Sequence, residues 1–124
     1  MNQAGGGRST SLGAYRTGSE VHDPATDTWR EGAPVPTGRS GVAAAVLGAR
    51  VYLFGGEMFE PRSTFDAAER YDPAADRWVV LPPMPTARHG LGAAALDGRI
   101  HVISGGPQAG LTFSDVHEVL EPAD

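Results

Sequence analysis

The 124-residue sequence contains no cysteine. Disulfide bonds, cysteine nucleophiles and cysteine-based metal sites are therefore excluded. A cluster of basic residues is also missing, since 10 Lys and Arg against 15 Asp and Glu give a net charge of −5. Proteins that bind nucleic acid carry a basic face. We therefore expect no nucleic-acid partner.

Long hydrophobic runs are missing as well. No stretch approaches the roughly 20 apolar residues that a membrane helix needs, and the N-terminal residues lack the apolar core of a signal peptide. We expect no membrane association and a cytoplasmic location, although a piece of a longer secreted protein would have the same features. The sequence has no phosphate-binding loop, no G-x-S-x-G elbow and no H-E-x-x-H pattern among its histidines. We therefore predict no catalytic residue, no metal and no cofactor.

Glycine and proline are abundant, with 17 and 10 residues, and both are typical of short strands joined by turns. The chain also matches itself without a gap when it is shifted by 49 residues, so that HDPATDTW (22–29) falls on YDPAADRW (71–78). Further positions repeat at this offset: Arg39 and Arg88; Glu20, Glu69 and Glu118; and Gly55-Gly56 with Ser104-Gly105. Such a period is the signature of a repeat architecture.

The one complete unit predicts four short strands, at 42–47, 50–55, 66–72 and 77–81. The first two are almost wholly apolar, which indicates that both faces are covered. In the last unit, Asp97-Gly98 between two apolar runs is a strong hairpin signal. A four-stranded sheet of this size cannot bury its faces alone, so like units must stack on it. Four strands per unit of this length predict an all-β fold of β-propeller blades.

The motif of the complete unit is Arg-x-Gly, a small-residue strand, Y-x-F-G-G, a loop, E-x-Y-D-P, then W and M-P. This pattern resembles the kelch repeat. The resemblance implies kelch-type propeller blades of four antiparallel strands in an incomplete ring, because the chain holds only about two and a half repeats. Residues 1–18 are then a flexible Gly/Ser-rich segment, and residues 19–124 divide into 19–38, 39–87 and 88–124.

Two interpretations explain the incomplete ring. The chain is either a fragment of a larger propeller or one of several copies that assemble a ring. The two ends overlap in the repeat register, so a head-to-tail ring would carry a surplus strand at every junction. The overlap favours a fragment, and self-association through open blade faces is the expected consequence of its unpaired edges.

Most recurring residues have a structural interpretation. Trp29 and Trp78 repeat and are expected to pack between blades, the alternative being an aromatic platform for a ligand. Glu69 is expected to bond backbone N–H groups or an arginine of the next blade, because a buried charge needs a partner. Gly55 and Gly56 allow close backbone approach, and Tyr71 and Asp72 complete the recurring set.

Arg39 and Arg88 open the first strand of each unit. The kelch resemblance places this position near the mouth of the central channel, where an arginine can bind a carboxylate through its planar fork. A salt bridge to an acidic residue of the same blade is an equal alternative. Ser40 and His89 follow the arginines and differ between units, so they are candidate specificity positions.

The loop 57–65 is the other candidate contact region, since long loops carry function more often than strands do. Phe59 and Arg62 within it are candidate partner contacts, although the apolar side chains of the loop can equally fold back over the blade. Together these features predict a protein-interaction module that binds a partner through its loops and its channel-mouth face. The alternative is a fragment of a kelch-propeller enzyme, such as a sugar mutarotase acting on a carbohydrate.

Overall fold

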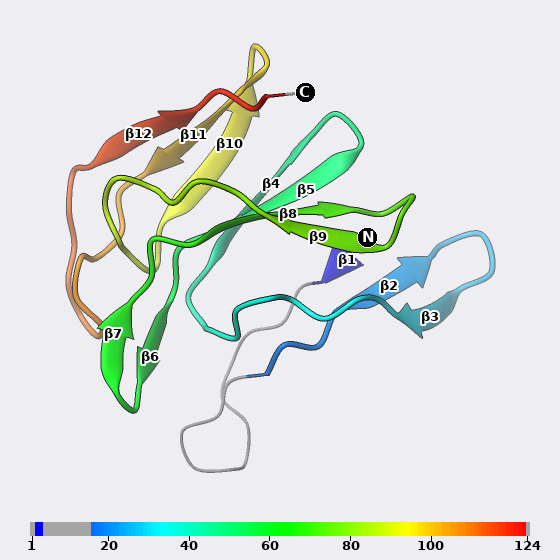
Figure 1. Ribbon diagram of the computed structural model, residues 1–124, viewed down its shortest axis with the longest axis horizontal. Coiled ribbons are helices and arrows are strands. Elements are labelled where there is room, and N and C mark those ends of the chain that lie inside the picture. Colours follow the sequence, from blue (N-terminus) through cyan, green and yellow to red (C-terminus); the bar gives the residue numbers. More distant parts are fainter. Residues whose placement is uncertain (1, 4–15, 124) are drawn as a thin grey trace.

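The computed structural model describes residues 2, 3 and 16–123, and the described residues form strands without any helix. The strands lie in three antiparallel sheets side by side, with a separate two-stranded hairpin (Figure 1). The described sheets do not close into a ring. This arrangement confirms the predicted all-β fold of stacked blades.

The complete unit forms the four-stranded sheet, called blade 2 below. Its strands are β4 (Ala43–Leu47), β5 (Arg50–Phe54), β8 (Ala68–Asp72) and β9 (Arg77–Val80), in the order β4-β5-β8-β9. All neighbours are antiparallel. Each strand lies within the range that the sequence predicts and is one or two residues shorter at an end.

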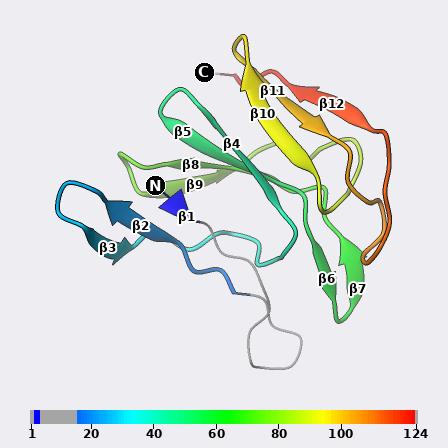
Figure 2. The ribbon, with the colours of Figure 1, turned by 180° about the vertical axis from the view of Figure 1, so that it is seen from behind.

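Three strands follow in blade 3, namely β10 (Gly92–Leu96), β11 (Arg99–Ile103) and β12 (His117–Leu120). The Asp97-Gly98 turn joins the first two, and both turn residues have positive φ angles of 52° and 75°. These angles match a type I′ hairpin, which the right-handed twist of the paired strands favours. The inner strand β10 lies against β4 of blade 2, as the view from behind shows (Figure 2).

Blade 1 contains β1 (Asn2–Gln3), β2 (Glu20–Asp23) and β3 (Thr28–Glu31). Asn2 pairs with Val21, one residue away from the register that a gap-free repeat would give. Of the segment 1–18, the remaining described part is 16–18. The flexibility predicted for residues 1 and 4–15 concerns a part of the chain outside the described residues.

The expected loop at 57–65 is instead a β-hairpin, and this corrects the sequence prediction. Its strands are β6 (Glu57–Phe59) and β7 (Arg62–Thr64), with Phe59 opposite Arg62 across the turn. The turn consists of Glu60 and Pro61, and proline suits a tight turn because its φ angle is fixed. The hairpin projects from the blades beside the connection between β11 and β12 (Figure 1).

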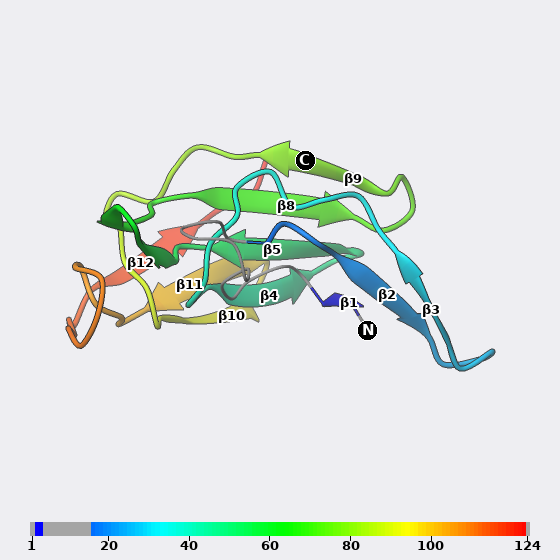
Figure 3. The same cartoon turned by 90° about the horizontal axis from the view of Figure 1, so that it is seen from below.

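The main hydrophobic core lies between blades 2 and 3. Tyr52 and Phe54 of β5 face Ile100 and Val102 of β11, and Met84 from the linker closes the cluster. Seen from below, the four strands of blade 2 lie one beside another from β9 to β4 and run across the view (Figure 3). Since each sheet buries only the face that meets a neighbour, stacking supplies the apolar burial that a single blade lacks. The core therefore fixes the position of the loops at the edge of the blades.

Candidate partner-binding site

A buried ion pair begins each of the last two blades. In blade 2, Arg39 Nη1 donates to Glu69 Oε1 at 2.6 Å, and both side chains are only 1% exposed. The same arginine donates to the carbonyls of Thr37 and Gly55, while the Thr37 hydroxyl donates to the second oxygen of Glu69. These bonds offset much of the cost of burying the charge pair, although Arg39 Nη2 is buried without a hydrogen-bond partner among the described residues. Arg39 therefore fixes the segment that leads into β4, called the entry of the blade.

Blade 3 repeats this arrangement. Arg88 Nη2 donates to Glu118 Oε1 at 2.7 Å, and the Thr86 hydroxyl donates to Glu118 Oε2. Burial opposes ionisation of Glu118, but the hydrogen bonds from Arg88 and Thr86 outweigh it, and the pKa of this carboxyl lies below its usual value. The expectation that the recurring glutamate pairs with an arginine of the next blade was wrong, because each pair lies within one unit.

The diglycine of blade 2 lies against the entry of blade 3. The amide N–H of Gly56 donates to the carbonyl of Arg88 at 2.9 Å. A side chain on Gly55 would overlap this same carbonyl oxygen, and a Cβ on Gly56 would lie 2.8 Å from the carbonyl oxygen of Ser40. Both positions also have positive φ angles. Close backbone approach between blades therefore requires glycine here.

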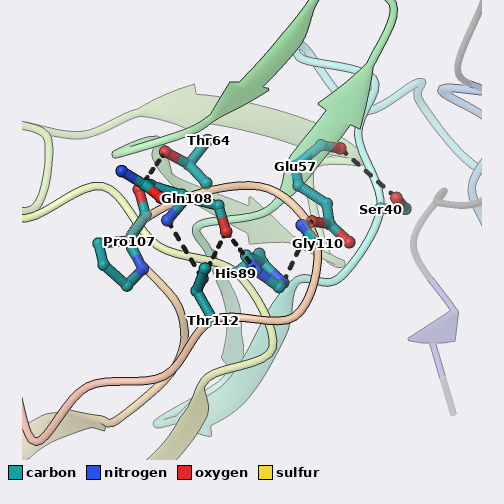
Figure 4. Close-up of polar contacts among 8 residues, drawn as sticks. All are labelled: Ser40, Glu57, Thr64, His89, Pro107, Gln108, Gly110 and Thr112. Carbon is teal, nitrogen blue, oxygen red and sulfur yellow. Dashed lines mark hydrogen bonds and ion pairs between the residues drawn. The ribbon is translucent and has the colours of Figure 1, made fainter.

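Ser40 and His89 connect the blade entries to the neighbouring loops. Ser40 forms a backbone bridge with Glu57, and His89 forms the equivalent bridge with Gly106. The His89 ring lies 3.3 Å through Nδ1 from Glu57 Oε2 and 2.9 Å through Nε2 from the carbonyl of Gln108 (Figure 4). His89 is buried. Its two ring contacts join the hairpin of blade 2 to the long loop of blade 3.

Two further hydrogen bonds tie the hairpin of blade 2 to the long loop of blade 3. The amide N–H of Gly110 donates to Glu57 Oε2 at 2.9 Å, and the Thr64 hydroxyl donates to the carbonyl of Pro107 at 2.9 Å (Figure 4). Residues 57–64 and 107–113 together are called the loop platform below. Because its two halves are bonded to each other, the platform is held as one surface.

The platform presents apolar and cationic side chains to solvent. Phe59 is 39% exposed, and the Arg62 guanidinium carbon lies 5.7 Å from the centre of its ring. Leu111 and Phe113 are almost fully exposed. Beside them, a groove of about 270 Å³ runs between β7 and residues 107–109. Exposed apolar side chains beside a groove mark a protein contact surface more often than an ordinary surface.

A different group of recurring residues holds blade 1 against blade 2. The Trp78 indole donates to the carbonyl of Ala33 at 2.9 Å, and the Tyr71 hydroxyl donates to Asp76 Oδ1 at 2.6 Å. Asp72 accepts a hydrogen bond from the amide of Ala74 within its own turn. Trp78 thus packs between blades, whereas Trp29 on blade 1 is 56% exposed.

The sequence did not identify Leu111 and Phe113, although their position carries a signal. They follow Ser104-Gly105 as Phe59 and Arg62 follow Gly55-Gly56, so the loop after each diglycine is the variable region of both units. The structure brings Phe59, Arg62 and His89 to the platform. It places Arg39 and Arg88 inside the blades.

Within the described residues, no group of three or more His, Asp or Glu side chains gathers as a metal-binding cluster. No helix among them is long and apolar enough to cross a membrane.

Comparison with known families agrees with the blade geometry. Residues 38–85 match the family model of the Kelch motif. The chain carries a kelch motif. The matched segment starts just before Arg39 and includes all of blade 2 and the first part of the linker to blade 3, so the kelch motif here corresponds to the complete four-stranded sheet. No curated protein matches the chain.

Proposed function

We propose that this kelch-repeat chain is a protein-interaction module that binds its partner through the loop platform and the adjoining channel-mouth face. The observation that carries the proposal is the pair of loops from two blades, bonded to each other and presenting Phe59, Leu111 and Arg62 to solvent. A surface that is held in shape before binding loses little conformational entropy when it binds. Kelch repeats commonly mediate protein interactions, which agrees with this assignment.

The chemistry of the platform defines the partner. Phe59 and Leu111 favour an apolar or aromatic anchor on the partner, since such anchors supply most of the binding energy of protein interfaces. Arg62 lies between them, as shown by its position over Phe59 and beside Gly110. An arginine at this place favours a carboxylate near the anchor. We therefore infer a partner segment that combines an apolar side chain with an acidic one.

The residues behind the platform have positioning roles in this proposal. Ser40 and His89 join the blade entries to the loops, and Arg39 and Arg88 hold those entries through their buried ion pairs. The proposed units are 19–38, 39–87 and 88–124, and the last two each contribute one half of the loop platform. Binding of a carbohydrate, self-association through the blade faces and a cytoplasmic location stay predictions.

The mutarotase alternative has no specific observation in its favour. It needs Arg39, Arg88 and His89 to reach a sugar, and all three side chains are buried with protein partners in the described residues.

Site-specific photo-crosslinking tests the proposal. A benzophenone amino acid replaces Leu111 in one variant and Val80, an exposed residue of β9 outside the platform, in another. After irradiation in extracts of the cells that make the protein, we expect a defined crosslinked protein from position 111 and none from position 80. Crosslinking of the same protein with equal yield from both positions, or from position 80 alone, would place the contact elsewhere and overturn the proposal.

A further inference from the structure

A clamp on blade 2 holds one residue of the linker that leaves blade 1. The amide N–H of Ala33 donates to Asp76 Oδ1 at 2.8 Å, and the carbonyl of Ala33 accepts from the Trp78 indole at 2.9 Å. Tyr71 supports both groups, because its hydroxyl donates to Asp76 and its ring centre lies 5.1 Å from that of Trp78 at an angle of 41°. The clamp thus binds a single linker residue, Ala33, through the backbone N–H and the backbone carbonyl of that residue.

Blade 1 carries a second copy of this clamp. His22 takes the place of Tyr71, and its Nε2 lies 3.0 Å from Asp27 Oδ1. The rings of His22 and Trp29 lie 4.9 Å apart at 36°, close to the values of the first clamp. Asp27 even shares the positive φ angle of its counterpart, 52° against 50° for Asp76. The second clamp therefore has its geometry in place before any ligand binds.

The two clamps differ in what they hold. The Asp27 side chain is 93% exposed and Trp29 is 56% exposed. In the described part of the chain, no backbone amide or carbonyl is bonded to these two side chains as Ala33 is bonded to Asp76 and Trp78. A carboxylate accepts a hydrogen bond and an indole N–H donates one, so these two exposed side chains match one backbone N–H and one backbone C=O.

We propose that His22, Asp27 and Trp29 form a peptide-binding site that takes an extended X-Pro segment of another polypeptide, with X held as Ala33 is held. The donor and acceptor of X bind Asp27 and Trp29. Proline follows because it favours the extended conformation of the residue before it.

The chain's own linkers argue against a second copy as the source of this segment. Gly32-Ala33-Pro34 is already bound by the clamp of blade 2. The corresponding residues of the next linker are Leu81-Pro82-Pro83, and Pro82 has no N–H to donate. The site lies on blade 1, whereas the loop platform joins blades 2 and 3, so its occupation does not depend on the proposed function.

The test uses the complete chain labelled with ¹⁵N, whose two tryptophans give two indole N–H signals. The probe is a synthetic peptide with the sequence of residues 31–36, Glu-Gly-Ala-Pro-Val-Pro, capped at both ends. We expect the Trp29 indole signal to move downfield as the peptide is added, with a dissociation constant on the order of 1 mM. The Trp78 signal should stay in place, because the Trp78 indole N–H already donates to the carbonyl of Ala33.

A matched peptide with proline in place of alanine lacks the backbone N–H that would donate a hydrogen bond to Asp27. It should bind about tenfold more weakly, and the Asp27→Ala variant should bind the original peptide with a similar loss, because each change removes one hydrogen bond to a charged group. No Trp29 shift, equal shifts with both peptides, or movement of Trp78 alone would each overturn the proposal. The signal of Trp78 also reports whether the Asp27→Ala variant is folded.

Discussion

Glu69 and Glu118 occupy the same position in successive blades, yet Glu69 is 1% exposed and Glu118 is 19% exposed. The difference follows from the neighbouring strand. Glu69 lies on β8, where β9 covers it from one side, whereas Glu118 lies on β12, the edge strand of the described part of blade 3. The third glutamate of the register, Glu20, is exposed. Glu69 and Glu118 thus form the same kind of ion pair at two degrees of burial, and Glu20 is the exposed glutamate of the register.

This difference in burial gives the first prediction. Glu69→Gln should lower the free energy of unfolding by about 3–5 kcal/mol, because it leaves the Arg39 charge buried without its partner. Glu118→Gln should cost about 1–3 kcal/mol, since water can reach that pair, and Glu20→Gln should stay within about 0.5 kcal/mol. Urea denaturation measures all three. Equal losses for Glu69→Gln and Glu20→Gln would show that the buried pair does not hold the blade.

The second prediction concerns the close approach at the diglycine. Gly55→Ala should lower the free energy of unfolding by more than about 2 kcal/mol, because its Cβ would overlap the Arg88 carbonyl and its φ angle is +67°. Gly92→Ala is the control, since its only near neighbour is the Ile103 carbonyl at 3.9 Å. Thermal unfolding should leave the control within about 1 kcal/mol of the wild-type protein. A similar loss for both variants would contradict the proposed backbone contact.

The third prediction is a pH dependence carried by Asp76. The hydrogen bond from the Tyr71 hydroxyl, helped by the one from Ala33 N–H, holds the pKa of Asp76 below its ordinary 3.8. A carboxyl whose pKa is lower in the folded chain contributes stability above its unfolded value, and this contribution is lost as the pH falls through the folded value. Tyr71→Phe should therefore weaken the loss of stability on acidification below pH 3.8. An NMR titration of Asp76 with a midpoint at or above 3.8 would contradict the lowered pKa of this carboxyl.

The same bond acts in the opposite direction at high pH. Burial, together with the hydrogen bond to Asp76, raises the pKa of the Tyr71 hydroxyl above its ordinary 10.0. A phenol with a raised folded pKa contributes stability below its unfolded value and loses it as the pH rises through the folded value. Stability should thus fall above pH 10.0 in the wild-type protein, and less so in Tyr71→Phe.

The fourth prediction is that Ala33→Pro loosens blade 1 from blade 2. Proline removes the N–H that Asp76 accepts, while the backbone tolerates it, because the equivalent linker position is Pro82. Amide exchange in β2 and β3 should become about tenfold faster, as expected for one lost hydrogen bond. Exchange in β10 and β11 is the internal control. Unchanged exchange in β2 and β3 would mean that the clamp does not hold the blades together.

The sequence predicted the blades well because the repeat itself encodes them. Turn residues such as Asp97-Gly98 and the alternation of apolar runs are local, and the 49-residue offset shows which strands belong together. The strand boundaries of blade 2 follow from these signals. The salt bridge within one blade was one of two alternatives for Arg39 and Arg88, and the repeat could not decide it, because every unit contains such an arginine and the offset cannot say which one lies closest to the glutamate.

The site was predicted only in part. The sequence pointed to Phe59, Arg62 and His89, but the hairpin of β6 and β7 has only three residues in each strand, too few for a clear alternating pattern. Leu111 and Phe113 lie in a segment without any strand signal. Their role depends on contacts between blades, such as that of Glu57 with Gly110, which no local pattern contains.

Binding of the crosslinked partner, once purified, tests the loop platform most directly. Isothermal titration calorimetry would compare the wild-type protein with Leu111→Ser combined with Phe59→Ser, and with Val80→Ser as the control for an exposed apolar residue elsewhere. We predict that the double variant binds at least about tenfold more weakly, as expected for the loss of apolar anchors, and that Val80→Ser binds as the wild-type protein does. Wild-type affinity in the double variant would contradict the platform as the partner-binding surface.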